Sequence, residues 1–166
     1  MNFKRAKIRI LGIDPGLEGA VAVLDSEQPD HVVTDDLPTV GLGTKRCIDE
    51  WALHRWLAVN NADHAFIEYV SAMQHWGAGG SFRFGMSFGT LRAVVALHGI
   101  PYTLVTPVKW KKYFGLAGGD KEGSRQRALQ LYPKSAQAFE RKKDHQRAEA
   151  ALIATYGFKT QFASGG

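Results

Sequence analysis

The sequence of 166 residues contains one cysteine, Cys47. A single cysteine cannot form an intramolecular disulfide, and it cannot supply a zinc site built from several thiolates. Long apolar runs are also missing near the start, where Asp14, Pro15 and Glu18 interrupt the apolar stretch that follows a basic opening segment. We therefore expect no signal peptide, no membrane span and a location in the reducing cytoplasm.

Acidic residues are fewer than basic ones, with 16 Asp and Glu against 21 Lys and Arg, a formal net charge of +5 and a pI of about 9.4. An excess of cations favours a polyanionic partner, because clustered Lys and Arg displace counterions from phosphates. The composition, 45% hydrophobic and 22% charged, is typical of a folded globular protein. The length predicts one domain over residues 1–158 and a flexible tail over 159–166.

The order of apolar patterns predicts an α/β fold. Three strands are expected first, over residues 8–14, 19–24 and 31–37, and a surface loop follows through Pro38, Gly41 and Gly43. Helices and strands then alternate, with helices expected at 48–60, 85–98, 106–112, 120–131 and 144–156, and strands at 65–70 and 102–105. Residues 71–82 are rich in glycine and predict a loop. This order predicts a mixed sheet with an antiparallel side and a parallel side.

Two acidic residues follow apolar strand segments directly. Asp14 comes after Ile10 to Ile13, and Glu68 comes after Phe66 and Ile67. Desolvation of a carboxylate on a buried strand costs on the order of several kcal/mol unless a partner or a metal compensates it, so both are candidate metal ligands. The structural alternatives are a turn residue before Pro15 for Asp14 and an edge-strand charge for Glu68.

The last predicted helix carries a second group of candidates. His145 and Glu149 are four residues apart and share a helix face, and Asp144 stands at the start of the helix. Alanines on both sides of Glu149 would let this helix approach the sheet closely. The structural alternatives are a helix N-cap for Asp144 and a solvated side chain for Glu149.

Four segments appear in one order along the chain: Gly-Ile-Asp-Pro-Gly, Ile-Glu-Tyr-Val, Val-Thr-Pro-Val-Lys-Trp-Lys-Lys and Asp-His-Gln-Arg-Ala-Glu-Ala-Ala-Leu-Ile-Ala. In content and spacing they resemble the RuvC-type Holliday junction resolvases, and the last segment is most similar to the phage-type branch. The resemblance extends from about residue 8 to about residue 156.

The resemblance implies a ribonuclease H-like fold, with a mixed five-stranded sheet flanked by helices, and a homodimer that makes paired nicks in four-way DNA junctions with water as the nucleophile. It also implies dependence on Mg²⁺, with Mn²⁺ as a substitute. The family's acidic ligands correspond to Asp14, Glu68 and Glu149. Bacterial relatives have a further acid three residues before the last, where this chain has Gln146, so Asp144 or His145 would complete the set, and Asp144 has the better charge for Mg²⁺.

DNA contacts are expected from basic and aromatic residues. Lys109, Lys111 and Lys112 correspond to the family's basic segment, and Lys121 follows at the next helix. Bacterial relatives place a base-stacking aromatic three residues after the second acid, where this chain has Ser71. The nearby residues that could replace it are Met73, His75, Trp76 and Phe82, and Trp76 and Phe82 are the aromatic candidates for DNA binding. Packing against a helix or a second subunit is the alternative role for them.

Other functions remain open at this stage. A nuclease acting broadly on forks, flaps and three-way junctions would use the same acids and differ in its loops. A junction-binding module without cleavage would not need the acids. An actin-like nucleotide-binding protein can also have a strand followed by Asp-x-Gly, but that class needs two related domains and a longer chain.

Overall fold

A computed structural model describes residues 7–71, 77–117 and 120–163 of the chain. Its main sheet has the strand order β3-β2-β1-β6-β7. The strands of this sheet are β1 (Arg9–Asp14), β2 (Ala20–Asp25), β3 (Val32–Asp36), β6 (His64–Glu68) and β7 (Tyr102–Val105). Strands β1, β2 and β3 pair antiparallel, whereas β6 is parallel to both β1 and β7. The predicted mixed five-stranded sheet is confirmed.

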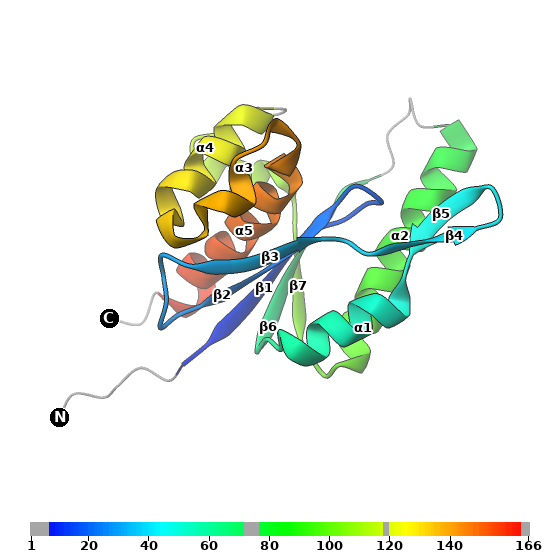
Figure 1. Cartoon of the computed structure of the whole chain (residues 1–166), viewed down its shortest axis with the longest axis horizontal. Coiled ribbons are helices and arrows are strands. Elements are labelled where there is room, and N and C mark those ends of the chain that lie inside the picture. Colours follow the sequence, from blue (N-terminus) through cyan, green and yellow to red (C-terminus); the bar gives the residue numbers. More distant parts are fainter. Residues whose placement is uncertain (1–6, 72–76, 118–119, 164–166) are drawn as a thin grey trace.

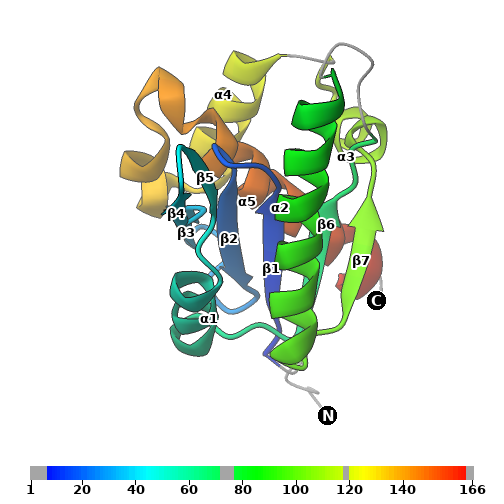
Figure 2. The same ribbon diagram turned by 90° about the vertical axis from the view of Figure 1, so that its right-hand side faces the viewer.

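Helices cover both faces of this sheet (Figures 1 and 2). One face packs against α1 (Glu50–Val59) and α2 (Gly77–Leu97). The other face packs against α3 (Pro107–Tyr113), α4 (Lys121–Leu131) and α5 (His145–Gly157). Short helical turns η2 (Pro133–Phe139) and η3 (Lys142–Asp144) connect α4 to α5. Each face of the sheet therefore has its own apolar core. None of the described helices is long and apolar enough to cross a membrane.

The two parallel strands at the centre bring their acidic ends to one edge of the sheet. Gly12 pairs with Phe66 and Ile13 with Ile67 in the β1–β6 register, so Asp14 and Glu68 follow at neighbouring positions. Side chains alternate between the faces of a strand. Ile10 and Phe66 belong to the core beneath α5. Asp14 and Glu68, an even number of residues further on, therefore lie on the α5 face.

Close packing of α5 on the sheet depends on small residues. A Cβ atom at Gly12 would overlap the carbonyl oxygen of Ala150 and lie 2.6 Å from the backbone nitrogen of Ala154. Ala150, Ala151 and Ala154 are completely buried. The backbone of α5 therefore approaches β1 directly, as the alanines around Glu149 predict, and carries Glu149 towards the end of that strand.

The expected surface loop after β3 is wrong, because this segment forms a second, two-stranded sheet. Strands β4 (Thr39–Leu42) and β5 (Lys45–Ile48) pair antiparallel around a turn in which Gly43 has a φ of +60°. Each strand has four residues, and Gly41 interrupts the first, so the period-two pattern is too short to recognise in the sequence.

The loop predicted over residues 71–82 is also wrong from residue 77 onwards. Helix α2 already begins at Gly77, although each glycine within a helix costs about 1 kcal/mol relative to alanine. Burial of Leu91 and Val95 against the sheet and the stacking of Phe84 on Phe88 within the helix favour the helix against this cost. The predicted loop residues 72–76, including Trp76, lie outside the described residues.

The predicted frayed tail is wrong over its first residues. Segment η4 (Phe158–Phe162) continues from α5 as a π-helical turn. Its Phe162 ring lies 6.5 Å from the ring of Phe66 and 5.5 Å from that of His64, measured between centroids. An aromatic side chain that packs on the sheet holds this end in place, which a polar-looking sequence does not reveal.

Candidate active site

Asp14 and Glu68 are buried acidic residues at the ends of β1 and β6, with exposed fractions of 8% and 6%. Burial raises the pKa of Asp14 well above its usual range, and the neighbouring carboxylates of Glu68 and Glu149 raise it further. Burial also raises the pKa of Glu68, against the hydrogen bond from Trp110. These shifts indicate a concentration of negative charge in a poorly solvated place, as is common at functional sites.

Glu149 reaches this place from α5. Its Oε1 atom lies 3.3 Å from the Nζ atom of Lys111 and accepts a hydrogen bond of 3.3 Å from the Ser124 hydroxyl. The side chain of Glu149 is only 13% exposed and that of Lys111 16%. The positive charge of Lys111 partly opposes the rise in the pKa values of Asp14 and Glu68. Lys111 is therefore the cation that the three carboxylates share.

Helix α3 holds the second carboxylate through a tryptophan. The indole Nε1–H of Trp110 donates a hydrogen bond of 2.8 Å to Oε1 of Glu68. Pro107 at the start of α3 and the paired strands β6 and β7, where Glu68 aligns with Val105, fix the position of this helix. Trp110 itself is completely buried.

The structure does not bring Asp144 into this group. Asp144 is 2% exposed and accepts hydrogen bonds from the backbone N–H and the guanidinium of Arg141, at 2.9 and 2.7 Å. Burial acts to raise the pKa of Asp144, but these hydrogen bonds outweigh it and keep the pKa below its usual value. His145 is half-buried, and its Nδ1 atom lies 3.2 Å from the Lys142 carbonyl oxygen.

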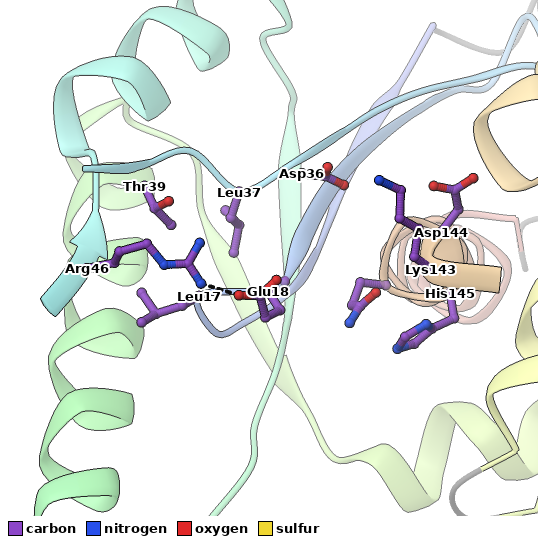
Figure 3. A pocket seen from close by; sticks show the side chains of 11 residues that line it. Leu17, Glu18, Asp36, Leu37, Thr39, Arg46, Lys143, Asp144 and His145 are labelled. Carbon is purple, nitrogen blue, oxygen red and sulfur yellow. Dashed lines mark hydrogen bonds and ion pairs between the residues drawn. The ribbon is translucent and has the colours of Figure 1, made fainter. Parts of the chain in front are cut away.

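A polar cavity of about 370 Å³ lies beside the start of α5 (Figure 3). The β1–β2 turn and the end of β3 form its other walls, through residues such as Glu18 and Asp36. Figure 3 shows the side chains of Asp144 and His145 pointing in different directions from the start of α5. The acids in this wall are already neutralised, because Glu18 pairs with Arg46, and Asp36 with Arg147.

The predicted DNA-binding lysines differ in their surroundings. Lys109, Lys112 and Lys121 are exposed, whereas Lys111 is engaged with Glu149. The charge of Lys121 also opposes the rise in the pKa of Asp14, so Lys121 acts on the carboxylate group. Phe82 is 69% exposed on α2. Trp76 lies outside the described residues.

Sequence reasoning did not identify Trp110 and Ser124 as parts of the site. One feature of the sequence could have indicated Trp110: it is the only large aromatic residue within a run of lysines, so it is expected on the buried side of that helix. No such feature indicates Ser124. It is completely buried, and its contact with Glu149 depends on the packing of α4 against α5.

The donor set suits a hard divalent cation. Three carboxylates, of which two have raised pKa values, gain most from a ligand that brings positive charge and accepts oxygen donors. As they are arranged, no three His, Cys, Asp or Glu side chains within residues 7–71, 77–117 and 120–163 form a closed metal cluster. Glu149 instead has Lys111 and Ser124 as partners. Asp14, Glu68 and Glu149 are the residues that would hold the ion.

The sheet order, the helices on both faces and the acids at the ends of β1 and β6 define a ribonuclease H-like fold of the RuvC resolvase type. Neither a protein-family model nor a curated protein matches the sequence.

Solved structures do match. RuvC of T. thermophilus in complex with a Holliday junction substrate has a TM-score of 0.67 at 12% identity, over 93% of this chain and 96% of that one. The fowlpox virus Holliday junction resolvase has a TM-score of 0.55 at 11% identity, over 92% and 98%. The yeast mitochondrial Holliday junction resolvase has a TM-score of 0.51 at 18% identity, over 89% and 77%.

Proposed function

We propose that this protein is a metal-dependent endonuclease that cuts four-way DNA junctions by paired nicks. The observation that carries the proposal is the meeting of Asp14, Glu68 and Glu149 around Lys111 in the fold of the junction resolvases. Carboxylates placed together in this way cost desolvation energy and repel one another, and a bound cation would offset both costs.

Different residues of this chain would bind the metal ion and the DNA phosphates. Asp14, Glu68 and Glu149 would hold Mg²⁺ or Mn²⁺, and the bound ion would supply the charge that activates water and stabilises the leaving oxygen. Lys109, Lys112 and Lys121 would bind flanking phosphates. His145 is the better candidate for a fourth ligand, because it lies one helical turn before Glu149, whereas Arg141 occupies the carboxylate of Asp144.

We also propose that the protein works as a homodimer, since a two-fold axis matches a four-way junction. The face of α2 supports this, because Met86 and Leu97 are 42% and 88% exposed at helical spacing. Sedimentation of the protein should give twice the mass of the 18.3 kDa chain, and Met86→Arg should shift it to the monomer. A wild-type protein that sediments as a monomer at micromolar concentration would contradict the dimer.

One incubation tests the activity. Purified protein is mixed with Mg²⁺ and end-labelled four-way, three-way, flap and linear duplex DNA. Symmetric nicks in the four-way junction, with chelator as the control, are the expected result. Absence of cutting with either Mg²⁺ or Mn²⁺ would overturn the proposal.

A broader nuclease for branched DNA is the second candidate. Position 71, three residues after Glu68, is an exposed serine rather than a stacking aromatic. Without that stacking residue, discrimination between junction types would be weaker. Equal cutting rates on every branched substrate in the same incubation would select this candidate.

A further inference from the structure

Helix α3 contacts two of the three acidic side chains with consecutive residues. Trp110 donates its indole N–H to Oε1 of Glu68, and the next residue, Lys111, pairs with Oε1 of Glu149. These two acids come from β6 and α5, which lie on opposite sides of the sheet–helix interface. One turn of one helix therefore connects the two acids.

The Trp110 ring also contacts the lysine. The Nζ atom of Lys111 lies 5.1 Å from the centre of the Trp110 ring, within the range of a cation–π interaction. The edge of the indole thus faces Glu68, and its face supports the ammonium group that pairs with Glu149.

Glu68 needs such support more than an aspartate would. Its longer side chain has several rotamers, and fixing one of them costs conformational entropy. Among the described residues, Trp110 provides the only hydrogen bond to the Glu68 carboxylate, and this bond occupies Oε1 while Oε2 accepts none. Because Trp110 is completely buried in the core between α3, α4 and α5, its ring cannot change rotamer without disturbing that core.

We propose that Trp110 is a positioning residue of the active site: its indole N–H fixes one oxygen of Glu68, which leaves the other oxygen available to a cation, and its ring supports Lys111. This inference rests on the proposed metal-dependent function. Trp110 touches neither substrate nor metal, and it acts through Glu68 and Lys111.

The chain offers a matched control. The Trp56 indole N–H also donates to a carboxylate, Oδ2 of Asp35, at 2.7 Å. That pair is exposed and lies on the other face of the sheet, against the core of α1 and α2. The indole N–H signal of Trp56 should therefore not respond to changes at the active site.

The test uses the indole N–H signals of the ¹⁵N-labelled protein during a Mg²⁺ titration, with Trp110→Phe and Trp56→Phe for assignment. We expect the Trp110 signal to move on addition of Mg²⁺ and the Trp56 signal to stay. By calorimetry, Trp110→Phe should weaken Mg²⁺ affinity about tenfold, as is typical when a group that orients a metal ligand is removed. Trp56→Phe should leave the affinity unchanged.

Replacement of Trp110 by 3-benzothienylalanine keeps a ring of similar size and removes the N–H, which separates the hydrogen bond from core packing. This variant should show the same decrease in Mg²⁺ affinity with an unchanged far-ultraviolet circular dichroism spectrum, which reports the backbone fold. The proposal would be overturned by an unchanged Mg²⁺ affinity in this variant, or by a Trp110 indole signal that does not move at saturating Mg²⁺. Absence of divalent-cation binding by the wild-type protein would instead refute the metal-dependent function on which it rests.

Discussion

At the scale of single residues, the acids of the site differ in what surrounds them. Asp14 and Glu68 are buried with raised pKa values, whereas Glu149 has an ion-pair partner in Lys111. Asp14 therefore lowers the stability of the folded protein, although the proposed catalysis would require it. The same carboxylate that costs folding energy in the free protein would be needed to hold the ion.

Glu149→Gln should abolish most of the cleavage, because the neutral amide keeps the hydrogen bond from Ser124 but lacks the charge required for a cation. We expect the rate on four-way junctions to fall by about a hundredfold or more, with junction affinity little changed in a gel-shift measurement. Glu140→Gln is the control, since Glu140 is exposed just before η3. Wild-type cleavage rates for Glu149→Gln would remove this residue from the ligand set.

Asp14→Asn should stabilise the metal-free protein at neutral pH by roughly 1–2 kcal/mol. In the unfolded chain Asp14 ionises near its usual pKa of 3.8, whereas the folded protein retains the proton to a higher pH. Between those two pKa values the unfolded state binds fewer protons than the folded state, so the wild-type free energy of unfolding falls as pH rises. The variant lacks this decrease.

Urea unfolding at pH 3 and pH 7 in chelator measures this difference. The stabilisation should be present at pH 7 and vanish at pH 3, where Asp14 is protonated in both states. Saturating Mg²⁺ should reduce or reverse it, because the ion stabilises only a protein that binds it. A variant that is less stable than the wild type at pH 7 would contradict the energetic cost assigned to Asp14.

At the scale of secondary-structure elements, the site depends on how closely α5 approaches β1. Gly12 provides the space, and the alanines of α5 fill it. Ser124 on α4 and Lys111 on α3 then contact the Glu149 carboxylate. The position of Glu149 is thus determined by three helices and one strand.

Gly12→Ala should destabilise the protein by about 1–3 kcal/mol, the usual cost of overpacking. Because the added methyl group would push α5 away from β1, the cleavage rate should fall as well, although residue 12 touches no substrate. Gly41→Ala is the control, since a Cβ atom there meets nothing within 4 Å. Thermal unfolding and junction cleavage of the two variants measure both effects, and equal stability of Gly12→Ala and wild type would refute the packing argument.

The sequence predicts the strands and helices that have long patterns, and it places Asp14 and Glu68 at the ends of buried strands from their position after apolar residues. It fails where structure depends on distant partners. The β4–β5 hairpin is too short to show a period, and α2 starts among glycines while its buried residues begin only at Ser87. The sequence also does not predict the acidic partners of Trp110 and Arg141, because packing determines them.

At the scale of the whole molecule, the distribution of charge matters for DNA. The net charge of +5 includes several cations with internal partners, such as Arg141 with Asp144 and Arg147 with Asp36. Lys109 and Lys112 remain exposed on α3, beside the candidate site. These lysines are better candidates for binding phosphates than the arginines that the structure pairs.

The double substitution Lys109→Gln and Lys112→Gln should weaken binding to all DNA forms alike. We expect the slope of log Kd against log salt concentration to decrease by about two, one for each phosphate that the variant no longer neutralises. Cleavage at saturating DNA should stay near the wild-type rate. Lys134→Gln is the control, because Lys134 pairs with Asp30 at the β2–β3 turn; an unchanged slope in the double variant would show that these lysines do not bind DNA.

The chain order of the acids also has a consequence for synthesis. Asp14 and Glu68 leave the ribosome early, whereas Glu149 belongs to α5, which docks on β1 only after nearly every other element has been made. A nascent or prematurely terminated chain therefore lacks one of the three acids. On the proposed function, the set of three acids that would hold the ion is therefore complete only after α5 has been made and has docked on β1.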